Sequence, residues 1–233
     1  MAGLLFIISA PSGSGKSTLV NELRRLVPGL EFSVSYTTRE PRGSEQEGQE
    51  YCFVSRRKFE DMIKAGEFLE YADVFGNYYG TPRRSLKDAA DQGKDLILDI
   101  DVQGARQVKK SHPEAVSIFI LPPNRQTLEK RLRNRSQSEG AIVDSVIERR
   151  LHDARREIEN SPIYDYSLVN DRLQYSIDQL KAIVLAERAL RSGRPLTIEE
   201  NGLVALAAPC AQRGQPHPKL KDILESFGQV VPG

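Results

Sequence analysis

An apolar run that leads directly into a glycine-rich loop is the feature that most constrains the fold of this chain. Residues 4–18 read LLFIISAPSGSGKST, so a segment suited to a buried strand is followed by small residues and then by Gly-Lys-Ser. Glycines let backbone N–H groups turn toward phosphate oxygens, the lysine reaches the β- and γ-phosphates, and the serine hydroxyl can hold Mg²⁺. The segment therefore predicts a strand, a loop and a helix that together bind a nucleoside triphosphate.

One position departs from the full phosphate-loop pattern G-x-x-x-x-G-K-[ST]. The chain has Ala10 where the pattern has its first glycine. A methyl group there matters only if the backbone needs a positive φ, and the chain keeps Gly13 and Gly15, the glycines nearest the phosphates. An ordinary Gly/Ser turn is the alternative interpretation, but the apolar strand before the loop and the helical spacing after it favour phosphate binding.

Composition limits the class of protein and the class of partner. Of the 233 residues, 39% are hydrophobic and 28% are charged, which is ordinary for a folded soluble protein. The 33 basic residues nearly balance the 32 acidic ones, so we expect neither a nucleic acid nor a membrane as a partner. Short apolar runs and the absence of a secretory-signal layout make the cytoplasm the expected location. Two cysteines do not suggest a disulfide scaffold, and the histidines show no zinc-ligand spacing.

Strands alternate with helices along most of the chain, and one middle region interrupts the alternation. We expect strands at 4–10, 31–38, 51–54, 68–75, 78–79, 95–101, 115–121 and 166–169, with helices after most of them and a last helix at 174–191. The alternation predicts an α/β fold with a parallel sheet and helices on both faces. The middle region reads as an inserted small antiparallel sheet with one helix, which Ser55 caps. From Gly193 the pattern fades, and only 219–227 is long enough for a short helix, so we expect a loosely attached tail that chemistry does not need.

Two carboxylates follow one another at a predicted strand end. Asp99 and Asp101 are two residues apart in LILDID, so both would point to one face of a strand at its carboxyl end, where α/β sheets bind ligands. They could organise Mg²⁺, with Asp99 nearer the metal, or hold a polar edge of a substrate. A solvated strand end is the alternative.

Arginines occur in two groups that suit phosphate oxygens. Arg39 and Arg42 lie in a polar loop, while Arg131 and Arg135 are one helical turn apart and share a face. Phosphoryl transfer needs cations on both acceptor and donor, because the two groups repel each other. For the second group a salt-bridged, solvated helix pair is an equal alternative, because acidic residues are interleaved. No histidine offers itself as a general base, which weakly favours an acceptor that is already anionic.

A carboxylate in the middle region could bind the edge of a purine base. Glu70 is suited to accept hydrogen bonds from the N1–H and the 2-amino group of guanine, a pair of donors that adenine cannot supply. Other polar groups in the middle region could join it, although tyrosines in a small sheet are usually packing residues: Ser35, Tyr51, Tyr79 and Thr81.

Several segments together resemble guanylate kinases. They are SAPSGSGKST, FSVSYTTREPR, GEFLEYADVFGNYYGTP, ILDIDVQG and RLRNR with a later ERRL, and the resemblance runs from about residue 4 to 191. It implies a P-loop kinase that transfers the γ-phosphoryl group of ATP to GMP, an essential step of guanine nucleotide synthesis and GMP recycling. ATP would be the co-substrate and Mg²⁺ the metal.

The resemblance also implies residue roles. The guanine base would contact Ser35, Glu70, Thr81 and Asp101, and the GMP phosphate would contact Arg39, Arg42, Tyr51 and Tyr79. ATP would contact Ser12, Gly13, Ser14, Gly15, Lys16, Ser17 and Thr18, with Asn170 near the adenine. The metal would be held by Ser17 and Asp99. Catalysis would fall to Lys16, Arg39, Arg131, Arg135 and Arg150, with Arg149 as the alternative to Arg150, because the segment before them is longer than usual for the family.

Domain boundaries follow from the same resemblance. The core would comprise 1–34 and 83–191, with a mobile lid at about 124–157, and the GMP-binding insertion would be 35–82. The tail, 192–233, lies outside the resemblance and is expected to be poorly ordered. Two alternatives stay open: a non-catalytic guanylate-kinase-like module that binds proteins, which should have a degraded phosphate loop, and a related kinase with a different phosphate acceptor.

Overall fold

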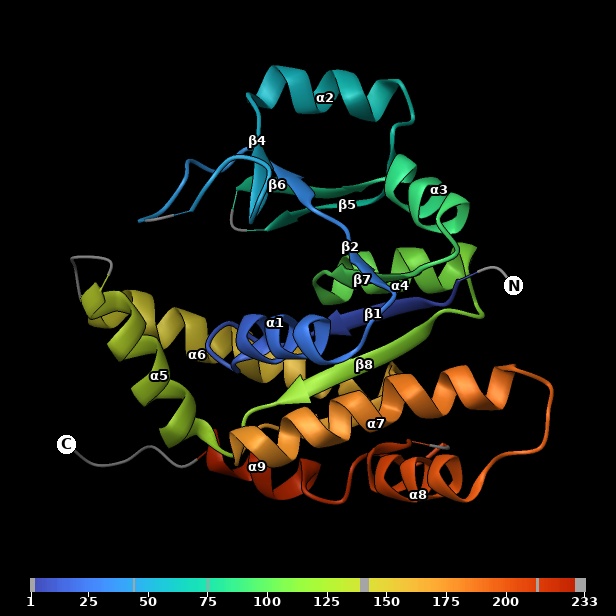
Figure 1. Ribbon diagram of the computed structural model, residues 1–233. Helices are drawn as coiled ribbons and strands as arrows, with labels where there is room; N and C mark the ends of the chain where they lie inside the picture. Colours follow the sequence, from blue (N-terminus) through green and yellow to red (C-terminus); the bar gives the residue numbers. More distant parts are fainter. Residues whose placement is uncertain (1–2, 44, 75, 139–142, 213, 229–233) are drawn as a thin grey trace. The chain divides into compact units, whose positions relative to one another are not determined.

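The computed structural model describes residues 3–43, 45–74, 76–138, 143–212 and 214–228 (Figure 1). The chain forms two compact units, one of residues 1–9 with 29–116 and the other of residues 10–28 with 117–233. These units are defined by which parts of the chain pack together and not by function. The division into core, insertion, lid and tail therefore stays a prediction. The parts of that division at 1–2, 44, 75, 139–142, 213 and 229–233 lie outside the described residues.

Three parallel strands form one sheet of the first unit. β7 (Asp95–Asp99) pairs on one side with β1 (Leu5–Ser9), in the register Leu5↔Leu96, and on the other side with β2 (Leu30–Phe32). All five residues of β1 are buried, which explains why this strand is a continuous apolar run without alternation. Two helices of this unit follow its strands in sequence: α3 (Arg83–Asp91) and α4 (Val102–Ser111).

A second, four-stranded sheet lies in the same unit in the order β4-β3-β6-β5. Its strands are β3 (Ser35–Thr37), β4 (Tyr51–Phe53), β5 (Phe68–Val74) and β6 (Asn77–Pro82). The hairpin of β5 and β6 is confirmed, but β3 and β4 run parallel, so the predicted antiparallel sheet is a mixed one. Helix α2 (Arg56–Lys64) covers this sheet through Phe59, whose ring stacks 4.4 Å from that of Phe68 (Figure 1). Ser55 caps α2 as predicted, accepting a hydrogen bond from the Lys58 N–H.

The single strand expected at 31–38 is wrong. The segment is divided between β2, which pairs with β7 in the parallel sheet, and β3, which pairs with β4 and β6 in the small sheet. Residues on both sides of the division are suited to strands, so local periodicity carries no signal that the chain changes sheet between them.

The second unit contributes two more parallel strands and most of the helices. β8 (Val116–Leu121) pairs with β9 (Tyr166–Val169) from Ile118↔Tyr166 to Leu121↔Val169. Helices α1 (Lys16–Leu26), α5 (Arg125–Ser138), α6 (Asp144–Glu159) and α7 (Leu173–Arg191) belong to this unit. Parallel strands connected through helices in both units confirm the predicted α/β class.

The C-terminal segment contains a helix that the sequence analysis missed. α8 (Ile198–Ala207) begins at Thr197, whose hydroxyl accepts a hydrogen bond from the Glu200 N–H, while the Glu200 carboxylate accepts one from the Thr197 N–H. This is a capping box, and its T-x-x-E signature is present in the sequence. The expectation that only 219–227 is helical is therefore wrong, although α9 (Leu220–Ser226) confirms a short helix there.

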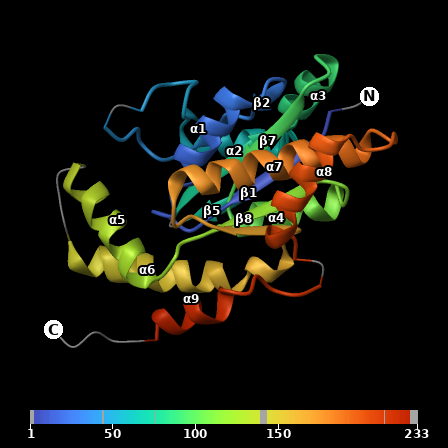
Figure 2. The same ribbon diagram turned by 60° about the horizontal axis from the view of Figure 1, so that its bottom comes forward.

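The expectation of loose attachment is also wrong for the described part of this segment. α8 packs along α7, and α9 lies beside α6 (Figure 2). Gln212 is buried, and its side-chain amide donates to the Ser161 carbonyl at 2.7 Å and to the Ser167 hydroxyl at 2.6 Å. The Arg125 N–H donates to the Ser226 hydroxyl at 2.9 Å. Whether chemistry needs this segment stays a prediction.

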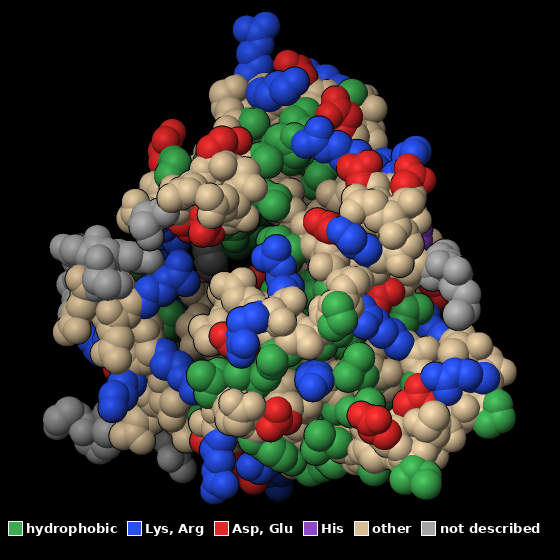
Figure 3. Space-filling model, in the orientation of Figure 1, with side chains coloured by type: hydrophobic (Ala, Val, Ile, Leu, Met, Phe, Trp, Pro, Cys, Tyr) green, Lys and Arg blue, Asp and Glu red, His purple; other side chains and the backbone are tan. Residues whose placement is uncertain are grey.

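Surface charge agrees with the balanced composition. Lys and Arg side chains are interspersed with Asp and Glu over the visible face in Figure 3. None of the helices in the described ranges is long and apolar enough to cross a membrane.

Candidate active site

The glycine-rich loop between β1 and α1 has the geometry of an anion cradle. Gly13 and Gly15 have φ of 86° and 89°, values that are unfavourable for residues with a side chain. The Ser14 N–H donates to the Pro11 carbonyl at 3.0 Å, and Gly15 caps α1, which begins at Lys16. The predicted strand, loop and helix are confirmed, and the first turn of a helix that follows such a loop is suited to bind phosphate oxygens through its backbone N–H groups. Ser12, Ser17 and Thr18 are exposed on this loop and turn.

One backbone carbonyl, that of Ser14, connects the loop to distant side chains. It accepts hydrogen bonds from the Asn170 amide at 2.8 Å and from the Arg131 guanidinium at 3.4 Å. Arg131 also donates to the Asn170 carbonyl at 3.0 Å. Asn170 is buried, and a Cβ atom at Gly15 would lie 2.4 Å from its amide nitrogen. Asn170 and Arg131 thus stabilise the loop by hydrogen bonds to its backbone. For Asn170 the sequence indicated no such role.

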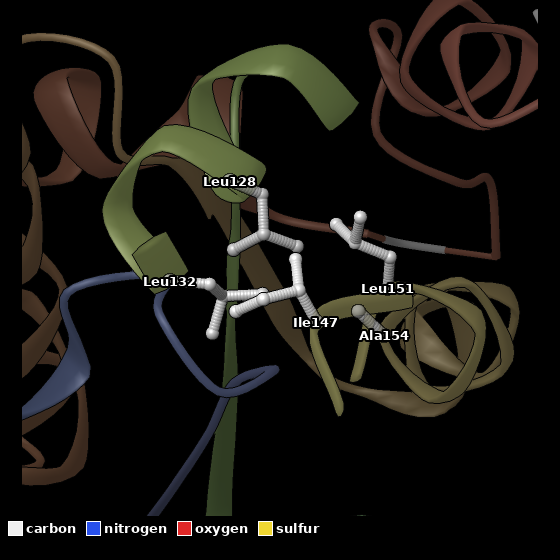
Figure 4. Close-up of a cluster of buried hydrophobic side chains, with 5 residues drawn as sticks. All are labelled: Leu128, Leu132, Ile147, Leu151 and Ala154. Carbon is white, nitrogen blue, oxygen red and sulfur yellow. The ribbon is translucent and has the colours of Figure 1, made fainter. Parts of the chain in front are cut away.

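Helix α5 packs directly onto the loop. A Cβ atom at Gly13 would lie 3.0 Å from the Leu132 Cδ2 atom and 3.2 Å from the Leu128 Cδ1 atom. Figure 4 shows Leu128 and Leu132 of α5 pointing toward buried side chains of α6, which are Ile147, Leu151 and Ala154. The helix pair of the predicted lid is therefore one hydrophobic cluster, and the loop lies against its edge.

The arginines of this helix pair separate into two kinds. Arg125 pairs with Glu129 at 2.9 Å and with Glu148 at 3.0 Å, and Arg133 pairs with Glu129 and Asp144. The salt-bridged helix pair is thus real for these two arginines. Arg131 instead donates to backbone carbonyls at the loop, and burial lowers its pKa.

The other predicted lid arginines differ in exposure. Arg135 is exposed on α5, Arg149 is exposed on α6, and Arg150 is half-buried. Arg150 lies one turn after Ile147 and next to Leu151, on the side of α6 that faces the hydrophobic cluster. This position favours Arg150 over Arg149 as the second lid arginine, a role that stays a prediction.

The predicted base-reading residues lie together in the first unit. Glu70 is only 4% exposed, and its Oε1 atom accepts hydrogen bonds from the Thr81 N–H at 3.0 Å and from the Thr81 hydroxyl at 2.6 Å. The Ser35 and Thr81 hydroxyl oxygens are 3.5 Å apart. Burial raises the pKa of Glu70 to about 7; the bonds from Thr81 oppose this shift and the charge of Asp101 adds to it. A carboxyl group with this pKa is poised to change its charge near neutrality.

The expectation that Asp99 and Asp101 share one strand face is wrong. β7 ends at Asp99, and Asp101 is the N-cap of α4, where its Oδ1 atom accepts a hydrogen bond from the Gly104 N–H at 2.8 Å. The cause is capping: an aspartate that accepts an N–H from the first turn starts a helix and so ends the strand early. Asp101 still lies near Glu70, as their electrostatic interaction requires.

The predicted acceptor-phosphate residues also meet. Arg39 is 8% exposed; its Nε–H donates to the Tyr79 hydroxyl at 3.1 Å, and its guanidinium carbon lies 5.3 Å from the centre of the Tyr51 ring. Its two terminal nitrogens donate to the two oxygens of Glu45 at 2.9 Å each. Burial alone would lower the pKa of Arg39, but the bonds with Glu45 and Tyr79 raise it overall. Arg42 is exposed, and its backbone N–H donates to Glu45.

Glu45 is a functional candidate that sequence reasoning missed. It is one of several glutamates in a polar loop, and nothing in its spacing distinguishes it from its neighbours. Only the folded loop shows that it holds both Arg39 and the backbone at Arg42.

Metal ligands are not prearranged as a cluster. In the ranges that the structure describes, no group of three or more His, Cys, Asp or Glu side chains could hold a metal ion. The predicted pair, Ser17 and Asp99, lies at the first turn of α1 and at the end of β7.

Comparisons with known proteins agree with one another. The sequence model of the guanylate kinase family matches residues 3–187. A guanylate kinase of Koribacter versatilis is 57% identical over 227 residues, 97% of each chain, and one of Geobacter metallireducens is 50% identical over 186 residues, 80% of this chain and 90% of the relative. The crystal structure of guanylate kinase from Anaplasma phagocytophilum has 34% identity and a TM-score of 0.66, covering 84% of this chain and 97% of that one. The match to the Koribacter relative extends past residue 187, so that relative shares most of the C-terminal segment.

Proposed function

The chain belongs to the guanylate kinase family and transfers the γ-phosphoryl group of ATP to GMP, giving ADP and GDP, and we propose how its residue clusters divide this reaction. The predicted family and enzyme class are confirmed. The activity also sets aside the two alternatives, a non-catalytic module and a kinase with another acceptor.

Glu70 recognises the guanine base. Its burial and its two hydrogen bonds from Thr81 hold the carboxylate in one orientation, and this is the observation that carries the proposal. A carboxylate in this place accepts the N1–H and 2-amino protons of guanine, whereas the same edge of adenine presents an acceptor at N1. Ser35, Thr81 and Asp101 complete the polar surroundings of the base.

Arg39 binds the phosphate of GMP, together with Tyr51, Tyr79 and Arg42. The guanidinium fork attracts the phosphate by its charge and has one terminal N–H that is not bonded to Glu45, Glu40 or Tyr79, and the tyrosine hydroxyls donate to the same phosphate. Glu45 holds the fork in plane before substrate binds, so that less side-chain entropy is lost when the phosphate arrives.

The loop and the first turn of α1 bind the phosphates of ATP, with Lys16 on the β- and γ-phosphates and Asn170 toward the adenine side. The Ser14 hydroxyl is buried and has no hydrogen-bond partner among the described residues, a cost that an oxygen of the ligand would offset. Ser12, Gly13, Gly15 and Thr18 line the same cradle.

Ser17 and Asp99 supply oxygen ligands of the kind that Mg²⁺ prefers. When bound with ATP, the metal neutralises charge on the β- and γ-phosphates. The hydroxyl and the carboxylate are both oxygen donors, and such donors fit this ion.

Three arginines stabilise the negative charge of the phosphoryl group in the transition state: Arg131, Arg135 and Arg150. Arg131 already donates a hydrogen bond to the loop. An acceptor phosphate is anionic near neutral pH, so the reaction needs no general base.

The enzyme works in the cytoplasm, where both nucleotides occur, without nucleic acid or membrane partners.

A coupled assay with ATP against GMP, dGMP, AMP, UMP and CMP tests the base assignment. In Glu70→Gln the preference for GMP over AMP should fall about tenfold to hundredfold, because one acceptor of a charge-assisted pair becomes an amide donor. Glu67→Gln, an exposed carboxylate just before the same strand, serves as the matched control and should leave the ratio unchanged. An unaltered ratio in Glu70→Gln would remove Glu70 from the base site.

A further inference from the structure

Helix α4 approaches Glu70 at a position that has no side chain. Gly104 is the third residue of α4, and a Cβ atom built there would lie 2.3 Å from the Glu70 Oε2 atom and 2.9 Å from its Cδ atom. The same Cβ atom would lie 3.4 Å from the Asp101 Oδ1 atom. Contacts below 3 Å are far shorter than van der Waals distance, so any side chain at position 104 would force something to move.

The backbone of Gly104 does not itself require glycine. Its φ is not among the positive values of this chain, and its place in the first turn of α4 is one that alanine adopts readily. A helix interior also favours alanine over glycine. Glycine at this position is therefore explained by space and not by conformation.

We propose that Gly104 is a specificity-determining position of this kinase, which lets the Glu70 carboxylate lie against the first turn of α4 in the orientation that reads guanine. This inference rests on the proposed role of Glu70 at the base site. Gly104 acts through Glu70 and is a positioning residue, not a catalytic one.

Neither Glu70 nor α4 can move aside at low cost. Thr81 holds the Oε1 atom of Glu70 with two hydrogen bonds, and the side chain is buried. On the other side, the Gln107 amide of α4 donates to the Tyr71 carbonyl at 2.7 Å and accepts from the Tyr71 N–H at 3.3 Å. The helix is thus tied to β5, the strand that carries Glu70, and an added methyl group has to displace the carboxylate.

The contact also has an electrostatic side. The first turn of a helix carries partial positive charge, which favours a carboxylate beside it, and more strongly so when the carboxylate is buried. Asp101 occupies one N–H of that turn as the N-cap, and Glu70 lies against the same turn. The close approach that Gly104 permits therefore offsets part of the repulsion between the two carboxylates.

Gly104→Ala tests the proposal, with Gly202→Ala as the matched control. Gly202 also lies inside a helix, α8, and a Cβ atom there meets nothing within 4 Å. We expect Gly104→Ala to raise the KM for GMP and to lower the GMP:AMP preference, each by about tenfold to hundredfold, with the KM for ATP unchanged. Gly202→Ala should leave all three quantities unchanged.

A double-mutant cycle shows whether Gly104 acts through Glu70. In a Glu70→Gln background, Gly104→Ala should change the GMP:AMP preference by less than twofold, because Glu70→Gln has already removed the charged contact with guanine that the methyl group disturbs. Additive effects of the two changes would overturn the proposal. Loss of ATP binding along with GMP binding in Gly104→Ala would assign the glycine a purely structural role and would also overturn it.

The base-binding role of Glu70 and the positioning role of Gly104 can be refuted separately. A Glu70→Gln enzyme that discriminates as the wild type does would refute the base assignment and the inference together. A Glu70→Gln enzyme that loses discrimination, beside a Gly104→Ala enzyme that keeps it, would refute the inference alone.

Discussion

The two substrate clusters of this enzyme are held in place by different kinds of interaction. In the acceptor cluster the bonds end on carboxylates: Glu45 accepts from the Arg39 guanidinium, and Glu70 accepts from the N–H and the hydroxyl of Thr81. In the loop cluster, side chains hold the main chain, because Asn170 and Arg131 both donate to the carbonyl of Ser14. A carboxylate can titrate and can be replaced, whereas a backbone carbonyl can do neither. The acceptor cluster should therefore set selectivity and pH response, and the loop cluster should set turnover and ATP affinity.

The largest expected effect lies in the loop cluster. Lys16→Ala should lower kcat about a hundredfold to a thousandfold or more, because a cation that stabilises charge in the transition state is lost. Steady-state kinetics with saturating GMP measure this loss, and Lys58→Ala, an exposed lysine of α2, is the control. Near-normal turnover in Lys16→Ala would refute the role of the lysine.

A smaller effect should follow when the loop loses its support. Asn170→Ala leaves the buried Ser14 carbonyl with one donor fewer, and we expect the KM for ATP to rise about tenfold, independent of pH. Asn201→Ala is a matched control, because its amide also donates to a backbone carbonyl, that of Thr197, but in an exposed place. An ATP KM that stays constant in Asn170→Ala would show that the loop holds its shape without this bond.

The KM for GMP should depend on pH, because the acceptor cluster contains a carboxyl group that titrates near neutrality. In the proposed function guanine binds the ionised form of Glu70, whose pKa is raised to about 7, so the KM for GMP should be roughly tenfold higher at pH 6 than at pH 8. The phosphate of GMP also titrates near pH 6, so the difference between wild type and Glu70→Gln is the quantity to measure. Parallel profiles for the two enzymes would contradict the prediction.

The same shift has a consequence for stability. A carboxyl group whose folded pKa is raised binds its proton more tightly in the folded state than in the unfolded state. Its contribution to stability is complete below about pH 4.5 and is lost as the pH rises through about 7. Thermal unfolding of wild type against Glu70→Gln between pH 5 and 8 should therefore show a difference that changes with pH.

The smallest expected effect concerns the C-terminal segment. Phe227 packs, half-buried, against the hydrophobic cluster of α5 and α6, so Phe227→Ala should lower the free energy of unfolding by about 1–2 kcal/mol. Denaturant unfolding measures this change, with Leu190→Ala, half-exposed at the end of α7, as the comparison. A Phe227→Ala protein as stable as the wild type would mean that this ring does not stabilise the helix pair.

Local signals predicted most of the fold, and each failure has a local cause. The loop glycines, the Ser55 cap and the hairpin of β5 and β6 are short-range features, and all of them are confirmed. The division of residues 31–38 between two sheets could not be predicted, because both halves carry the same strand pattern. The capping box of α8 was readable in the sequence but was overlooked within a segment rich in proline and glycine.

The sequence could predict which residue types form the site, but not which of them contact one another. The sequence named Arg39, Glu70 and Thr81, and the structure brings their neighbours into hydrogen-bond distance. It could not name Glu45, which no spacing distinguishes, or show that Asn170 supports a loop 156 residues earlier.

The sequence by itself determined which chemical groups this protein possesses: a glycine loop with a lysine, two groups of arginines and a carboxylate suited to guanine. Those properties belong to residue types and to short spacings, which the chain carries before it folds. Only the tertiary structure decided which arginine faces a carboxylate and which faces a carbonyl, and why position 104 has no side chain. Burial and partners set charge state, orientation and free space, and these arise only when residues far apart in the chain are packed together.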